Sequence, residues 1–457
     1  MDAKLPATSV AQLLAERIAT LRADALPAAV KQKCEDLLID VAGLCVTARN
    51  EDYVTSALAG CDDEGPCTAI GHARTLSSAS AAFINGTAAH GEDFDDTFEG
   101  GPVHAGAVIV PAVLAACERH GRDGQAALLG IAIGTEVMCR LSLVTPKLVH
   151  KAGFHPTAIF GVMGAAGGVS ASLGLNAKQT VDALGIAGSF ASGIIEYLTD
   201  GAWTKRLHPG WAAQSGIRAA LLARGGFFGP RSVFEGIHGL FHGFARTTQG
   251  NYEAVTGDFG TNWVTETLAF KPYPCGTMAH PYIDCAKRLA ARGIKATDIK
   301  EMVCEVAEGT VHRLWEPLAA KQRPPNGYAA KFATPFILAT GFVKSGVGLS
   351  DFTPEAVRDP DVLALAAKVR FVIDPNNPYP NAFTGHIRCV LNDGTVIEER
   401  QPHFRGGANE PLTHADIEEK FALNARHGGW DDKRSAAALA VLAKLYGGKI
   451  NLASLRG

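Results

Sequence analysis

Apolar residues recur every three to four positions through most of the first 250 residues, and this helical period limits what the chain can fold into. The pattern starts at Ser9, which forms a predicted capping box with Gln12. Further helical stretches are expected at 30–45, 77–92, 107–120, 124–143, 157–173, 177–190 and 211–224. No strand-like run separates them, which indicates an all-α domain packed closely through Gly and Ala.

The period changes after Phe270. The segment Lys271–Gly276 carries two prolines and a glycine and predicts a hinge or entry loop. Strands are expected at 301–307, 368–373, 384–391 and 395–399, with a hairpin turn at 392–394 between the last two. Helical spacing returns after about residue 405. The prediction is a mainly α chain, with a large discontinuous helical domain (1–268 and 405–457) and a smaller α+β lid domain (269–404).

Composition excludes several classes of protein. The formal net charge of the 457 residues is −3 and no Lys/Arg-rich run occurs, which argues against a nucleic-acid partner. The ten cysteines never form a C-x-x-C pair, so they are expected to be buried thiols in a reducing compartment.

The N-terminus lacks the pattern of a signal peptide. The uncharged run 157–176 is expected to be a core helix and not a membrane span, so the predicted location is the cytoplasm.

The densest polar cluster reads H-G-E-D-F-D-D-T at 90–97 and is followed by His104. Three acids within four residues repel one another, so neighbouring groups must offset their charge. A solvated loop or helix cap would explain the cluster without any function. Carboxylates that orient a catalytic histidine, or a divalent-metal site, are the functional alternatives.

Three more clusters carry groups suited to acid–base chemistry or carboxylate binding. His155 precedes the long uncharged helix, whose N-terminus favours an anion. Lys205, Arg206 and His208 place three donors within four residues, between two tryptophans. His280 ends the run K-P-Y-P-C-G-T-M-A-H-P at the expected domain junction, a common place for ligand sites. Each cluster also has a purely structural interpretation. No nucleotide-binding glycine motif and no G-x-S-x-G elbow occurs.

Taken together and in this order, four segments resemble the MmgE/PrpD family over nearly the whole chain. They are G-T-A-A-H-G-E-D-F-D-D-T, G-F-H-P-T, K-R-L-H-P-G-W-A-A and F-K-P-Y-P-C-G-T-M-A-H-P. That family includes 2-methylcitrate dehydratases, cis-aconitate decarboxylases and iminodisuccinate epimerases. The resemblance implies a helical domain and an α+β lid with the site in a cleft, no metal and no organic cofactor, and a homodimer.

The resemblance also implies roles for individual residues. His104, His155 and Lys205 match the acid–base and carboxylate-binding positions and are the predicted catalytic groups. Asp93 is expected to hold a neighbouring imidazole in one tautomer. The predicted substrate-binding residues are Asp93, Thr97, Arg206, His208 and His280.

Two departures from the family pattern bear on the reaction. Lys331–Phe336 ends in phenylalanine where the dehydratases and decarboxylases have tyrosine, which removes a phenol that could donate a proton. The K-R-L-H-P-G stretch also looks unlike that of 2-methylcitrate dehydratases.

The shared first step is abstraction of a proton from the carbon next to a carboxylate, with cations stabilising the developing charge. Return of the proton to the other face gives epimerisation, which is the predicted reaction, similar to iminodisuccinate epimerase. Loss of a group makes the protein a dehydratase or another lyase of a 2-methylcitrate- or aconitate-like tricarboxylate, which is the alternative. Two interpretations from other classes are a terpene-cyclase-like enzyme that uses D-F-D-D to anchor Mg²⁺, and a non-catalytic polycarboxylate-binding protein.

Overall fold

The computed structural model describes residues 8–380 and 382–457, which form two compact units. The first unit contains the chain up to Gly91, Asp95–Ala269 and Thr413–Gly457. The second contains Glu92–Phe94 and Phe270–Leu412. The chain therefore enters the second unit twice, once for three residues and once for the whole segment after Ala269.

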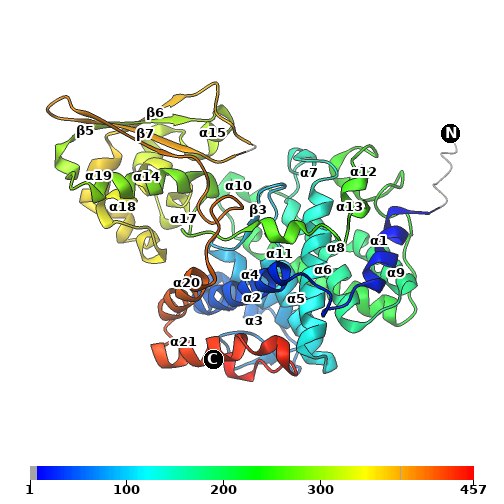
Figure 1. Cartoon of the computed structure of the whole chain (residues 1–457). Coiled ribbons are helices and arrows are strands. Elements are labelled where there is room, and N and C mark those ends of the chain that lie inside the picture. The colour runs from blue at the N-terminus through cyan, green and yellow to red at the C-terminus, as the bar shows by residue number, and fades with distance from the viewer. Residues whose placement is uncertain (1–7, 381) are drawn as a thin grey trace. The chain divides into compact units, whose positions relative to one another are not determined.

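The first unit is helical (Figure 1). Its helices are α1 (Val10–Thr20), α2 (Ala28–Ala48), α3 (Asp52–Ala59), α4 (Ser78–Gly91), α5 (Gly106–His120), α6 (Gly124–Ser142), α7 (Leu148–Lys151), α8 (Pro156–Leu173), α9 (Ala177–Phe190), α10 (Tyr197–Asp200), α11 (Thr204–Arg224), α12 (Leu240–Ala245), α13 (Glu253–Thr256), α20 (His414–His427) and α21 (Asp432–Leu442). The capping box predicted at Ser9 is present at the start of α1.

Two differences from the predicted helical pattern stand out. Strand β1 (Cys67–Thr68) pairs with β2 (Thr75–Leu76), and β3 (Thr97–Phe98) pairs with β4 (Leu268–Ala269). Two residues are too few to show an alternating pattern, so no periodicity predicts these strands. Helix α11 also begins seven residues earlier than predicted, because Pro209 near its start removes only one intrahelical hydrogen bond.

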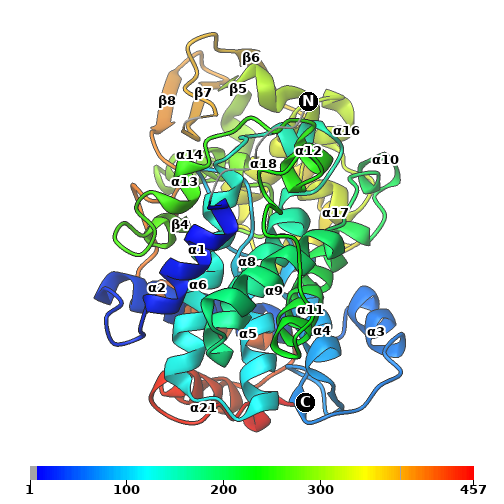
Figure 2. The same ribbon diagram turned by 90° about the vertical axis from the view of Figure 1, so that its right-hand side faces the viewer.

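Helices α5, α6 and α8 lie side by side and form the centre of the first unit (Figures 1 and 2). Glycines allow this close approach, since a Cβ on Gly134 would lie 2.9 Å from the carbonyl oxygen of Gly164. Helix α8 is long and apolar enough to span a membrane, yet 94% of it is buried inside the described structure. It is therefore the core helix that the sequence predicts.

The C-terminal helix α20 packs against α2 in the same unit. Lys420 Nζ lies 2.7 Å from Asp40 Oδ1, and both side chains are buried. The ten cysteines, all within the described residues, are buried and form no disulfide, as predicted.

The second unit has a four-stranded sheet covered by helices. The strands are β5 (Ile299–Val306), β6 (Val369–Ile373), β7 (Gly385–Leu391) and β8 (Val396–Gln401), in the order β6-β5-β7-β8. Only β5 and β6 are parallel, and β7 and β8 form the predicted hairpin. The helices are α14 (His280–Ala291), α15 (Val311–Leu314), α16 (Leu318–Gln322), α17 (Gly327–Ala330), α18 (Thr334–Lys344) and α19 (Pro360–Ala366). A mainly α fold with a smaller α+β part is thus confirmed.

Candidate active site

Four histidine rings from four segments of the first unit lie next to one another. They are His90 at the end of α4, His104 before α5, His155 at the N-cap of α8, and His208 in α11. The ring centroids are 4.9 Å apart for His90 and His104, 5.7 Å for His90 and His155, and 5.2 Å for His155 and His208. We call these four residues the histidine cluster. Three of them were predicted site residues, and the structure adds His90.

A close contact between two helix backbones holds His90 and His208 in place. Gly210 in α11 packs directly on α4, where a Cβ would overlap the carbonyl oxygen of Phe83. A Cβ on Gly86 would in turn lie 2.7 Å from the Cα of Gly210. Neither glycine can therefore carry a side chain without moving one helix relative to the other.

His155 is fixed by the start of α8. Its backbone N–H donates to the carbonyl oxygen of Gly193 at 2.9 Å, and Pro156 supplies the first helical residue. The backbone N–H of His104 donates to Thr157 Oγ1 at 3.3 Å, which ties the loop before α5 to the same helix end.

Asp95 is the carboxylate that contacts imidazoles in this cluster. Its Oδ2 lies 2.6 Å from Nδ1 of His90, and its Oδ1 lies 3.6 Å from Nδ1 of His104. His104 Nδ1 also donates to the carbonyl oxygen of Asp96 at 2.7 Å. Because a carbonyl only accepts, Nδ1 of His104 carries hydrogen, and Nε2 is the basic nitrogen of the neutral ring.

Asp96 is a structural residue at the start of α5. Its carboxylate accepts hydrogen bonds from the backbone N–H groups of Ala105 at 3.0 Å and Gly106 at 2.8 Å. Complete burial and the nearby Asp95 and Asp40 raise the pKa of Asp96 well above its ordinary value, and the two N–H donors oppose this.

His155 and His208 are held neutral. Burial, together with the charges of His90, His208, Lys205 and His104, lowers the pKa of His155 well below its ordinary value. Burial, His90 and Lys205 lower the pKa of His208 to about 4. The two Nδ1 atoms lie 3.0 Å apart, so one ring donates to the other. Two buried neutral imidazoles beside a lysine suit the removal of a proton from an anionic substrate.

The remaining predicted residues of this unit take different positions. Lys205 lies in the first turn of α11, and its charge acts on both His155 and His208. The guanidinium of Arg206 lies 4.3 Å from the ring centroid of Tyr53, so α11 is packed against α3 by this cation–π contact. Thr97 is buried on β3.

A second polar cluster lies in the second unit, around Glu92 and Asp93. Lys271 Nζ lies 3.4 Å from Asp93 Oδ2 and donates to the backbone oxygen of the same residue at 2.9 Å. Lys331 Nζ lies 2.5 Å from Glu92 Oε2. Both lysines are almost fully buried. In the histidine cluster, Asp95 is the carboxylate that contacts imidazoles, whereas Asp93 pairs with Lys271 and its charge acts on the imidazole of His280. In the sequence these acids differ only in their order, so the motif does not show which of them contacts an imidazole.

His280 does not have the geometry of a carboxylate donor. It is fully buried, and its Nε2 donates to the carbonyl oxygen of Cys275 at 3.1 Å. Burial, and then the charge of Lys271, lowers the pKa of His280 to about 3. Its Nδ1 is therefore a hydrogen-bond acceptor at neutral pH, which argues against the predicted role.

Some atoms of the histidine cluster that could ligate a metal are engaged in hydrogen bonds. Ligand-type atoms of His90, Asp95 and His104 lie within 4.8 Å of one another. Nδ1 of His90 and Nδ1 of His104 both donate to oxygen and so offer no lone pair. The acids of D-F-D-D are paired with Lys271, His90 and backbone N–H groups, which also argues against a Mg²⁺ anchor.

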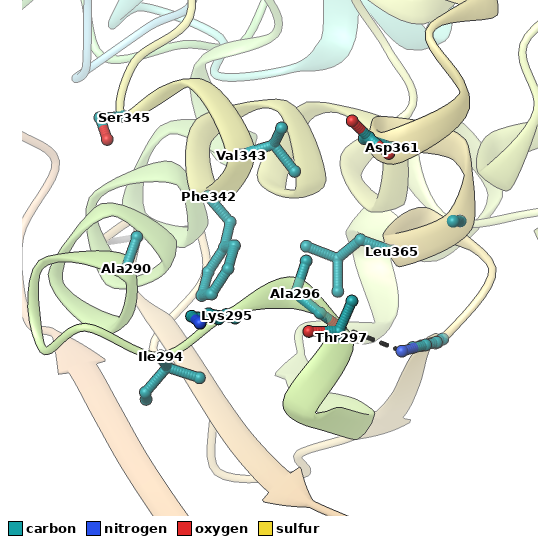
Figure 3. A pocket seen from close by; sticks show the side chains of 12 residues that line it. Ala290, Ile294, Lys295, Ala296, Thr297, Phe342, Val343, Ser345, Asp361 and Leu365 are labelled. Atoms are coloured by element: carbon teal, nitrogen blue, oxygen red, sulfur yellow. Dashed lines mark hydrogen bonds between the residues drawn. The ribbon is translucent and has the colours of Figure 1, made fainter.

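A separate pocket of about 550 Å³ lies in the second unit beside α14, α18 and α19 (Figure 3). Phe342, Val343 and Leu365 line it, and Lys368 at its edge donates to the carbonyl oxygen of Ala296. No histidine and no cysteine is among the lining residues, so this pocket lacks the acid–base groups of the histidine cluster.

Comparisons with known proteins match most of the chain to one family. The chain matches the MmgE/PrpD N-terminal domain over residues 12–253 and the MmgE/PrpD C-terminal domain over residues 273–444. It is 28% identical to a cis-aconitate decarboxylase-like protein of Aspergillus oryzae, over 91% of this chain and 90% of that protein. It is 28% identical to cis-aconitate decarboxylase of Aspergillus terreus, over 88% and 86%. Human cis-aconitate decarboxylase is 31% identical, over 78% of this chain and 74% of that protein.

Proposed function

The chain belongs to the MmgE/PrpD family, and from this premise we propose that it is a lyase acting on a small tricarboxylate related to cis-aconitate, without a cofactor. The observation that carries the proposal is the histidine cluster, in which two neutral imidazoles, a lysine and the Asp95-backed His104 lie together. The decarboxylase relatives support a lyase better than the epimerase predicted from the sequence.

The proposed decarboxylation needs one acid and one source of positive charge. The bond from the CH₂ carbon to its carboxylate breaks, CO₂ leaves, and the electron pair forms a new double bond to the central carbon. The electrons of the original double bond move to its outer carbon, which takes up a proton. His104 is the proposed acid, because Asp95 stabilises its protonated form. Lys205 is the proposed partner of a substrate carboxylate, and it stabilises the charge that develops next to it.

The same residues would serve dehydration, with His155 removing the proton next to the carboxylate. Epimerisation shares that first step. The absence of a phenol at position 336 does not argue against a lyase, because the side chain of Phe336 is 1% exposed and lies in the apolar core of the second unit.

Incubation of the purified protein in D₂O with cis-aconitate, 2-methylcitrate and substituted succinates tests the proposal. A lyase releases CO₂ or water, and decarboxylation leaves one deuterium on the new CH₂ group, visible by NMR. His104→Asn should lose turnover by about 10²-fold or more, whereas His238→Asn, on the exposed surface, serves as the matched control. Deuterium uptake into a succinate without loss of any group would establish the epimerase instead, and no turnover of any carboxylate would leave a binding protein.

A further inference from the structure

Asp95 lies between two histidines, and one of them has no role in the proposed reaction. His90 ends α4 with 1% of its surface exposed, and Asp95 is fully buried. The short contact, 2.6 Å, joins Asp95 to His90, whereas His104 is 3.6 Å away on the other carboxylate oxygen. The catalytic candidate is therefore the more distant partner of this carboxylate.

A carboxylate that is out of contact with water needs a compensating charge or strong hydrogen bonds. His90 is the group placed to supply it, because its Nδ1 donates to Asp95. His90 also lies in the last turn of α4, where the terminal backbone carbonyls favour a positive charge. These two features both favour positive charge on the ring of His90, and its burial opposes it.

We infer that His90 is a positioning residue that acts on His104 through Asp95. When His90 satisfies Asp95, the carboxylate attracts the proton of His104 only weakly, and His104 can release it to substrate. When His90 is removed, Asp95 keeps one imidazole neighbour and holds the proton of His104 firmly. The catalytic consequence rests on the proposed function, but the charge coupling does not.

Other charged groups act on the same cluster and stay constant in the test. They are His155 at the start of α8, His208 and Lys205 in α11, and Asp40 of α2, whose charge reaches Asp95 and Asp96. These groups set the pKa of His104 in the wild type. Because they are the same in every variant, a difference in that pKa between variants comes from the substituted residue.

The test uses His90→Asn, because asparagine places an N–H close to the position of Nδ1 and cannot carry a proton. The pKa of His104 is followed by NMR of histidine-labelled protein, with no substrate present. His90→Asn should raise the pKa of His104 by at least one unit, which means that His104 binds its proton at least ten times more tightly. The acidic limb of the pH–rate profile should shift by the same amount. Asp95→Asn should lower that pKa. The double variant should return it towards the wild-type value.

The alternatives give different results. A purely structural His90 would lower the melting temperature and leave the pKa of His104 unchanged, which would overturn the inference. So would stoichiometric Zn²⁺ binding that is lost in His90→Asn. If His90→Asn fails to fold, the Asp95→Asn variant still tests the coupling. An unchanged pKa of His104 in that variant would refute it. If the pKa shifts as expected but the wild type turns over no carboxylate, the proposed function fails and the coupling stands.

Discussion

Replacing His280 with glutamine should make the second unit less sensitive to acid. The glutamine amide nitrogen can take the place of Nε2 and keep the hydrogen bond to the carbonyl oxygen of Cys275. The substitution removes the titrating group and retains the donor. It thus separates the protonation of His280 from its packing between Tyr273 and Phe404.

The magnitude follows from the shift in pKa. Burial lowers the pKa of His280 from 6.5 to about 3, so in the folded protein the ring stays neutral when the unfolded chain already binds a proton. A histidine whose pKa is lowered on folding makes its full contribution to the free energy of unfolding above pH 6.5. This contribution is lost as the pH falls towards 3. Linkage gives a loss of about 2 kcal/mol between pH 7 and pH 5, and about 5 kcal/mol over the whole range.

The assay is equilibrium unfolding in urea at pH 7 and pH 5, read by a short pulse of hydrogen exchange at one fixed pH. Peptides from β5 and α14 report on the second unit alone. The wild type should lose about 2 kcal/mol more than His280→Gln between the two pH values. Equal losses in both proteins would mean that His280 is protonated in the folded state, and its use as a cationic carboxylate donor would then be restored.

Four further outcomes are expected. Gly210→Ala should destabilise the first unit by about 1–3 kcal/mol in urea unfolding, because the new methyl group overlaps Phe83 in α4. Lys420→Met should cost about 3 kcal/mol or more, since it leaves Asp40 buried without its cation, and adding Asp40→Leu should recover much of the loss. Chelation by EDTA should leave turnover unchanged; loss of activity restored by a metal would contradict this. Sedimentation should show the expected homodimer, and Phe228→Asp, at a side chain 80% exposed, should weaken it if this surface is the interface.

The sequence predicted most helices and the main sheet, for a clear physical reason. Helix α8 is an uncharged run that starts at Pro156, helix α9 has a capping box, and the hairpin at Asn392–Gly394 has a turn that selects one pairing. Features that depend on distant residues were missed. One such feature is the early start of α11, whose Gly210 packs closely on α4, a contact that no local pattern reveals.

The site was predicted in part for the same reason. His104, His155 and His208 each stand in a recognisable motif, and they meet in the structure. His90 stands in the first of these motifs, but the sequence assigns it no role, because its partner Asp95 is only distinguishable from Asp93 in three dimensions. The sequence likewise does not indicate that Lys271 and Lys331 are buried, because lysine is rarely buried.

The stretch 90–97 shows how a chain can bury a dense group of acids beside donors of its own. Its carboxylates do not share one counter-charge. Glu92 and Asp93 belong to the second unit, where Lys331 and Lys271 neutralise them, whereas Asp95 and Asp96 belong to the first, where His90 and the N-terminus of α5 do so. Glu92 and Asp93 are thus paired with lysines, Asp96 with backbone N–H groups, and Asp95 with an imidazole. That difference places the imidazole–carboxylate pair of the motif next to His104, where the proposed reaction needs it.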